Sequence, residues 1–192
     1  MDIRDFFFRN RGYIPIPLAI IILTFASIKI ELLPIGVVLV VTGELLRLNG
    51  VRYAGGETRT LKVGASVLCS SGPFAFVRNP LYLGNMLMYV GIVLIAGSAN
   101  VWLMVATTLS FFLIQYSLII SLEEETLTLL FEKGYEEYKS NVPAIFPRIS
   151  RWDTRDNIRP SNLIKTLKTE KRTLQNVVFI LILIYLRIQV FY

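Results

Sequence analysis

Five blocks of apolar residues alternate with polar segments along the chain, and each block is long enough to form a membrane-spanning helix. The blocks cover residues 13–30, 32–48, 81–96, 101–122 and 174–190. An α-helix needs roughly 17–25 such residues to cross a hydrocarbon core of about 30 Å. Pro15 and Pro17 fall at the start of the first block, where a helix tolerates a missing N–H. The pattern therefore predicts an all-α membrane bundle of about five transmembrane helices.

The basic residues lie almost entirely on one side of this predicted bundle. All 20 Lys and Arg residues except Lys29 and Arg187 lie before the first block, at or after the end of the second and before the third, or between the fourth and fifth. Five crossings put these three segments on the same face, and the positive-inside rule makes that face cytoplasmic. We therefore expect a multi-pass protein whose N-terminus and polar segments, residues 49–79 and 123–173, face the cytoplasm.

The composition fits one membrane domain over residues 1–192. Hydrophobic residues make up 54% of the chain and charged residues 18%, whereas soluble domains carry roughly a quarter charged residues. The net charge of +6 is concentrated beside the apolar blocks, where anionic lipid headgroups are the expected neighbours. No nucleic-acid-binding module is visible in the sequence. We therefore expect the bilayer, and not nucleic acid, to be the partner of the basic segments.

The side chains available for chemistry are restricted, because the sequence has no histidine and a single cysteine, Cys69. The single cysteine excludes an intramolecular disulfide. The absence of histidine excludes Ser-His-Asp and Cys-His nucleophiles and a histidine-ligated metal. Carboxylates, tyrosines, arginines, lysines, backbone groups or a bound cofactor must carry any reaction. We expect no metal.

A first candidate motif, SGPFAFVRNPLYLGN, covers residues 71–85 at the start of the third apolar block. Pro80 suits the first turn of that helix, and Asn79 suits its N-cap. The free N–H groups at a helix start attract an anionic group, and Gly84 would let a ligand approach the backbone closely. The same residues also suit an ordinary interfacial cap with Tyr82 in the aromatic belt.

A second candidate motif, EEETLTLLFEKGYEEY, covers residues 123–138 at the cytoplasmic end of the fourth block. Three adjacent carboxylates repel each other, so we expect a cation such as Arg78, or a ligand with hydroxyls and a positive group, beside them. Leu127, Phe131, Tyr135 and Tyr138 follow at spacings of four, four and three residues, which predicts one face of a helix. A solvated charge cluster and a face packed on the bilayer are the alternative interpretation.

Three further features have a structural and a functional interpretation. The segment 143–148 is bounded by prolines and rigid, so it either closes a pocket across the bundle mouth or forms an ordinary loop. Glu44 and Arg47 are spaced for an (i, i+3) ion pair in the second helix. The polar loop that follows suits contact with lipid phosphates through Arg52, Gly55, Gly56, Thr58 and Arg59.

The first two motifs, in this order and on these helices, resemble those of the integral membrane methyltransferases. That family includes isoprenylcysteine carboxyl methyltransferase and the phospholipid N-methyltransferases. Its pattern is Gly-Pro-aromatic, then Arg-His-Pro-x-Tyr-x-Gly opening a membrane helix, then a helix ending in Glu-Glu, with spaced Leu, Phe, Tyr and Tyr and a closing Pro. The matching residues here are Gly72, Pro73, Phe74, Arg78, Pro80, Tyr82, Gly84, Glu123, Glu124, Leu127, Phe131, Tyr135, Tyr138 and Pro147. The match covers residues 68–148; Asn79 replaces the family's His, and Ala144 stands where an Arg is often found.

The resemblance implies an S-adenosylmethionine (SAM)-dependent methyltransferase with a cofactor site on the cytoplasmic face and a lipid or lipophilic acceptor. SAM brings its own electrophilic methyl group, so the reaction needs no histidine, metal or covalent nucleophile. The implied cofactor-binding residues are Gly72, Pro73, Phe74, Asn79, Pro80, Tyr82, Glu123 and Glu124, and the implied catalytic residues are Arg78, Asn79 and Tyr82. Arg78 would bind the cofactor carboxylate or order the glutamates. The loss of Arg at Ala144 disfavours a prenylcysteine carboxylate and leaves O-, N- and S-methylation open.

Three other functions compete with this interpretation. A non-catalytic membrane scaffold of the same fold is consistent with Asn79 and Ala144. An NADPH-dependent membrane reductase of the sterol-reductase type has a similar cytoplasmic end, but this chain is short for that fold. A transporter is disfavoured because no broken, charged pair of helices is apparent. The enzymatic interpretation requires Arg78 and Glu124 to lie at one site.

Overall fold

The structure is a computed structural model, and it describes residues 2–56, 60–61, 63–153, 156 and 158–191. Thr58 and Arg59 of the polar loop lie outside the described residues. The described residues contain no strand, and their helices are α1 (Ile3–Arg9), α2 (Ile16–Thr24), η1 (Ile30–Leu32), α3 (Leu33–Ala54), η3 (Gly72–Ala75), α4 (Pro80–Ala96), α5 (Val101–Asn141) and α6 (Leu163–Phe191). The all-α prediction is confirmed.

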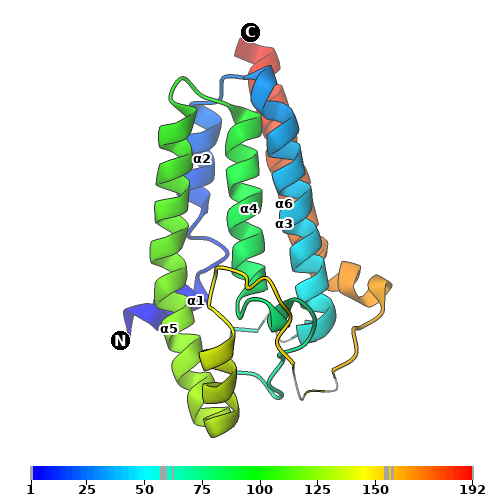
Figure 1. Cartoon of the computed structure of the whole chain (residues 1–192). Coiled ribbons are helices and arrows are strands. Elements are labelled where there is room, and N and C mark those ends of the chain that lie inside the picture. The colour runs from blue at the N-terminus through cyan, green and yellow to red at the C-terminus, as the bar shows by residue number, and fades with distance from the viewer. Residues whose placement is uncertain (1, 57–59, 62, 154–155, 157, 192) are drawn as a thin grey trace.

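The long helices α3, α4, α5 and α6 stand together and alternate in direction along the bundle (Figure 1). The N-terminus, η3 and the chain that follows α5 gather at the lower end of this view, and the C-terminus lies at the upper end. Both sequence motifs therefore lie at the same end of the bundle.

Helices α3 and α4 approach each other across facing glycines. A Cβ atom added to Gly43 would lie 2.5 Å from the carbonyl oxygen of Gly84, and one added to Gly91 would lie 2.6 Å from that of Gly36. Only glycine permits backbones this close, as in small-residue helix interfaces of membrane proteins. This contact holds the first turns of α4, which carry the first motif, against α3.

The helix expected over residues 13–30 is much shorter in the structure. Helix α2 has nine residues, which span about 14 Å at 1.5 Å per residue. The chain leaves the helix at Phe25, and the N–H of Ser27 donates to the carbonyl oxygen of Ala96, 3.0 Å away, which ties it to the end of α4. Among the described residues, α5 and α6 are each long and apolar enough to cross a membrane, and α4 is apolar but shorter. The count of five spans stays a prediction.

Helix α5 continues well past the expected end at residue 122 and then reverses. Glu132 has φ 46° and ψ −125°, which breaks the helix. In a straight helix the Cα atoms of Glu124 and Lys139 would lie about 22 Å apart, yet Lys139 Nζ lies 2.7 Å from Glu124 Oε2. The last part of α5 therefore folds back beside the glutamates, as Figure 1 shows at the lower end of the helix.

Helix α6 begins at Leu163, well before the expected start at residue 174. Only 6% of its most apolar stretch is buried, and Val178, Phe179 and Ile182 are exposed. A soluble monomer rarely exposes a contiguous apolar surface of this kind. The exposed face of α6 therefore suits contact with lipid.

Two apolar clusters hold the molecule together. The larger cluster lies within the bundle and includes Phe112 and Ile119 of α5 and Ile184 of α6. The smaller one is built on Tyr135, Tyr138 and Val142, in and just after the returning part of α5. Tyr135 and Tyr138 belong to the second motif, so this smaller cluster packs that motif against Leu68 and Trp152.

Candidate functional site

The two motifs meet in an ion pair between Arg78, just before α4, and Glu124 in α5. Arg78 Nη2 lies 2.5 Å from Glu124 Oε1, and Nε donates to the same oxygen at 3.1 Å. The side chains are only 9% and 14% exposed, so water screens their attraction weakly. The structure thus brings together the cation and the glutamate that lie in separate polar segments of the sequence.

Arg78 also secures the reversed end of α5. Its Nη1 donates to the carbonyl oxygen of Lys139 at 2.9 Å and to that of Val142. Lys139 in turn pairs with the second carboxylate oxygen of Glu124. One guanidinium and one carboxylate therefore join the start of α4, the main part of α5 and its returning arm.

Tyr82, in the first turn of α4, binds the neighbouring carboxylate of Glu123. Its hydroxyl lies 3.0 Å from both Oε1 and Oε2. Burial raises the pKa of Glu123 to about 7 from its ordinary 4.5, although the hydrogen bond from Tyr82 and the charge of Arg11 lower it. Near neutral pH this carboxyl group therefore exchanges between its protonated and ionised forms.

The proline-bounded segment 143–148 lies along the first motif. The N–H of Arg78 donates to the carbonyl oxygen of Pro143 at 2.9 Å, and the N–H of Arg148 donates to that of Phe76 at 3.0 Å. Asn79 donates to Ala144 from its backbone N–H at 3.2 Å and from its side-chain Nδ2 at 3.1 Å. Asn79 stands at the N-cap position, but its side chain makes no capping bond there. Its amide fixes the segment to α4.

The four spaced apolar residues of the second motif do not form one face of one helix. Leu127 and Phe131 precede the break at Glu132, and Tyr135 and Tyr138 follow it. They meet because the chain folds back, and they pack in one cluster with Leu68, Val142 and Trp152. Tyr138 also donates to the carbonyl oxygen of Phe74 at 2.8 Å. The predicted grouping holds, but the predicted geometry is wrong.

Gly84 does not leave space for a ligand. A Cβ atom there would lie 2.6 Å from Cγ of Arg47 and 2.7 Å from the carbonyl oxygen of Gly43. The side chain of Arg47 fills the space beside Gly84, so the expectation of ligand contact at this glycine is wrong. Beyond the expected (i, i+3) spacing with Glu44, Arg47 reaches Glu170 on α6, a contact that no sequence pattern indicated.

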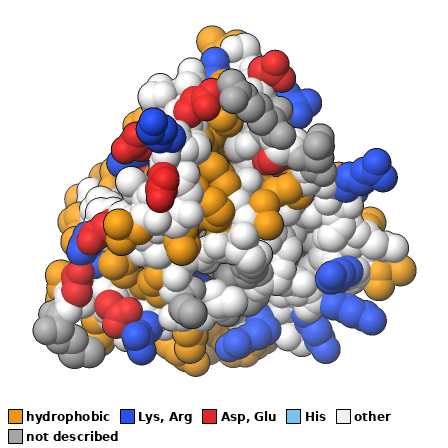
Figure 2. All heavy atoms as spheres, turned by 90° about the horizontal axis from the view of Figure 1, so that it is seen from below, with side chains coloured by type: hydrophobic (Ala, Val, Ile, Leu, Met, Phe, Trp, Pro, Cys, Tyr) orange, Lys and Arg blue, Asp and Glu red, His pale blue; other side chains and the backbone are white. Residues whose placement is uncertain are grey.

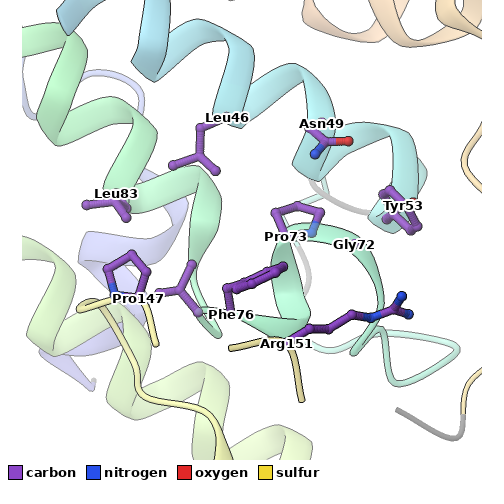
Figure 3. Close-up of a pocket in the computed structure, with 10 residues that line it drawn as sticks. Leu46, Asn49, Tyr53, Gly72, Pro73, Phe76, Leu83, Pro147 and Arg151 are labelled. Carbon is purple, nitrogen blue, oxygen red and sulfur yellow. The ribbon is translucent and has the colours of Figure 1, made fainter. Parts of the chain in front are cut away.

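A cavity of about 400 Å³ opens beside the first motif, between α3, η3, α4 and the loop that carries Arg151 (Figure 3). Its lining comprises Leu46, Asn49, Tyr53, Gly72, Pro73, Phe76, Val77, Leu83, Pro147 and Arg151. Its volume falls within the range of about 300–1,000 Å³ typical of small-molecule sites.

The cavity contains only part of the predicted cofactor set. Gly72 and Pro73 line it, whereas Phe74, Asn79, Pro80, Tyr82, Glu123 and Glu124 are not in its lining. The first motif thus has two sides: its opening turn borders the cavity, and its Arg78 and Tyr82 side chains meet the glutamates. Within the described residues, no group of three or more His, Cys, Asp or Glu side chains is placed to hold a metal ion.

A family model described as phospholipid methyltransferase matches residues 32–134. The cobalt-zinc-cadmium resistance protein CzcN of Cupriavidus metallidurans is 33% identical over 85 residues, which cover 44% of this chain and 38% of that protein. The nickel-cobalt-cadmium resistance protein NccN of Alcaligenes xylosoxydans xylosoxydans is 29% identical over 123 residues, 64% of this chain and 53% of that protein. The chain thus spans about half or less of these relatives. No solved structure matches it.

Proposed function

The chain belongs to the phospholipid methyltransferase family, and from this premise we propose that it transfers a methyl group from SAM to a lipid or lipophilic acceptor. The Arg78–Glu124 ion pair carries the proposal. It joins the two family motifs at one end of the bundle and sets Tyr82 and Glu123 beside them. A scaffold would need no such convergence of partly buried charges, which are costly to remove from water.

The cofactor site is assigned to the glutamate side of the first motif. SAM supplies an electrophilic methyl group on a cationic sulphur, and its amino group and ribose hydroxyls are donors that suit carboxylate acceptors. Glu123 fits this role, since its half-buried carboxyl group has Tyr82 as its neighbour and a pKa of about 7. The side chain of Asn79 is proposed to complete this site, whereas Gly72 and Pro73, which were also expected to bind the cofactor, line the cavity on the other side of the motif.

Arg78 is assigned an ordering role at this site. Its guanidinium donates to Glu124 and to two backbone carbonyl oxygens, so its donors are largely used within the protein. Of the two roles expected for Arg78, ordering the glutamates is therefore better supported than binding the cofactor carboxylate. Positioning of this kind supplies much of the rate in group transfer.

The acceptor is proposed to reach the site from the lipid. The cavity beside Gly72 and Pro73 has an apolar wall that includes Leu46 and Leu83, with Asn49 and Arg151 as polar groups. That mixture suits a molecule with an apolar body and a polar end. A multi-pass topology with this end in the cytoplasm is supported by the Lys and Arg side chains at the site end, which Figure 2 shows from below together with acidic ones.

A labelled-methyl assay tests the proposal. Purified full-length protein is mixed with methyl-labelled SAM and a total lipid extract, and the label in the organic phase is measured. We expect the wild type and Glu136→Gln, an exposed control on the returning arm of α5, to transfer label, and Glu123→Gln to transfer much less. No transfer by the wild type to any lipid fraction, or oxidation of NADPH in its place, would overturn the proposal.

A further inference from the structure

A buried ion pair joins α6, which lies outside the family match, to the helices that carry the motifs. Arg47 Nη2 on α3 lies 2.7 Å from Glu170 Oε2 on α6, and the side chains are 7% and 0% exposed. Thr173, one turn further along α6, lies 3.3 Å from the same nitrogen. Replacing such a pair with apolar residues often leaves stability unchanged or higher, so stability alone is a weak reason for its presence.

The second terminal nitrogen of Arg47, Nη1, binds α4, the helix that begins with the first motif. Nη1 donates to Oδ1 of Asn85 at 2.7 Å, and Nδ2 of Asn85 donates to the hydroxyl of Tyr116 at 2.9 Å. The missing side chain at Gly84 leaves room for the Arg47 stem to pass between α3 and α4. One cation thus fixes the orientation of the Asn85 amide, which in turn fixes the Tyr116 hydroxyl.

Tyr116 completes the connection to the proposed cofactor site. Its ring stacks on that of Tyr82, with centroids 4.4 Å apart and planes 25° from parallel. Tyr82 then holds Glu123 through its hydroxyl. An unbroken series of contacts therefore runs from Glu170 through Arg47, Asn85, Tyr116 and Tyr82 to Glu123, across α6, α3, α4 and α5.

We propose that Arg47 and Glu170 are positioning residues: through them, α6 sets the orientation of Tyr116 and Tyr82 at the SAM site. Part of this inference rests on the proposed function, because Tyr82 is assigned to the cofactor through it. Both residues act through their neighbours and touch no reactant. Residues linked in one network commonly show mutual coupling. A substitution at Glu170 is therefore expected to change the orientation of Tyr82, although the two residues lie on different helices.

The test uses three variants of the full-length protein in detergent. Glu170→Gln keeps the side-chain shape and removes the charge. The double variant Arg47→Met/Glu170→Met replaces the pair with apolar side chains, which is expected to restore thermal stability lost in Glu170→Gln. Ile184→Ala is the matched control, because Ile184 is a buried residue of α6 (2% exposed) that packs in the core. It weakens the packing of α6 and leaves the ion pair in place.

Two readouts separate positioning from stability. SAM affinity, measured by calorimetry, is expected to fall about tenfold in Glu170→Gln and in the double variant but to stay within about twofold of wild type in Ile184→Ala. NMR signals of ring-labelled Tyr82 and Tyr116, assigned by Phe substitution, are expected to shift in the first two proteins and not in the control. Affinity that tracks thermal stability across all three variants would overturn the inference.

The tyrosine signals also keep the two proposals distinguishable. If the wild type binds no SAM, the proposed function fails, and the NMR comparison still tests the coupling from α6. If SAM binds to the wild type but the Tyr82 and Tyr116 signals are unchanged in Glu170→Gln and the double variant, the coupling is wrong and the proposed function stands.

Discussion

Arg78 and Glu124 are separated by 46 residues in the sequence and share a largely buried ion pair in the fold. The turn that leads into α4 places Arg78 beside Glu124, and the reversal of α5 at Glu132 brings Lys139 and Val142 back to the same ion pair. Arg78 also donates to the backbone carbonyl oxygens of Lys139 and Val142. Loss of Arg78 should therefore disturb both motifs together.

Arg78→Ala is expected to destabilise the protein by about 3 kcal/mol, because it leaves a mostly buried carboxylate with one partner and two carbonyl oxygens without this donor. Lys133→Ala removes an exposed charge from the same reversed segment and should change stability by no more than about 0.5 kcal/mol. Unfolding of both variants in mixed micelles checks this. Equal stabilities would show that the ion pair contributes little.

The stability of the protein should depend on pH through Glu123. Its folded-state pKa of about 7 lies above the ordinary 4.5, so the folded protein holds this proton more tightly than the unfolded chain. The stabilisation from this group is fully present below pH 4.5 and is lost as the pH rises through about 7. Unfolding free energies of wild type and Glu123→Gln should therefore diverge across that window. Parallel pH profiles would contradict the raised pKa.

Tyr82→Phe should alter the titration of Glu123 and keep the ring stack on Tyr116. The hydrogen bond from Tyr82 lowers the pKa of Glu123, so its removal should raise that pKa further. If the ionised carboxylate binds SAM, SAM affinity increases with pH in the wild type, and the midpoint should move to higher pH in Tyr82→Phe. Tyr89→Phe, on the same helix and packed on Phe112, is the control and should leave the midpoint unchanged.

The glycine contact between α3 and α4 should not tolerate a methyl group. Gly43→Ala would place Cβ 2.5 Å from the backbone oxygen of Gly84, and relief requires the helices to separate, at a cost of about 1–3 kcal/mol or more. Gly134→Ala meets no atom within 4 Å and should be neutral or slightly stabilising, since alanine favours a helix more than glycine does. Thermal melting of the two variants distinguishes them. A neutral Gly43→Ala would contradict the close approach.

The apolar pattern predicted the bundle but not every helix end. Residues 81–96 correspond closely to α4, because a proline at the start and a glycine after the end mark its limits. Hydropathy alone missed the early start of α6, since residues 163–173 are basic and their inward face is polar, with Thr166 and Glu170 buried. It also overestimated α2, which ends where Ser27 bonds to the end of α4.

The contact between the two motifs was predicted from the sequence, but the geometry around it was not, and the roles of these residues at a cofactor site stay predictions. The charge imbalance of the glutamates indicated a nearby cation, and Arg78 fills that role. The reversal at Glu132 was hidden because Leu127, Phe131, Tyr135 and Tyr138 repeat at helical spacing, and Gly134, two residues after Glu132, is a weak signal for a break. The link through Arg47 and Glu170 joins residues 123 positions apart, a separation that no local pattern encodes.

Calorimetry of the purified protein with SAM and with NADPH tests the central claim most directly. We predict that the wild type binds SAM and not NADPH, that Glu123→Ala and Glu124→Ala weaken SAM binding, and that Glu136→Ala binds SAM like the wild type. Binding of NADPH without SAM, or SAM binding that is unchanged in both Glu123→Ala and Glu124→Ala, would contradict it.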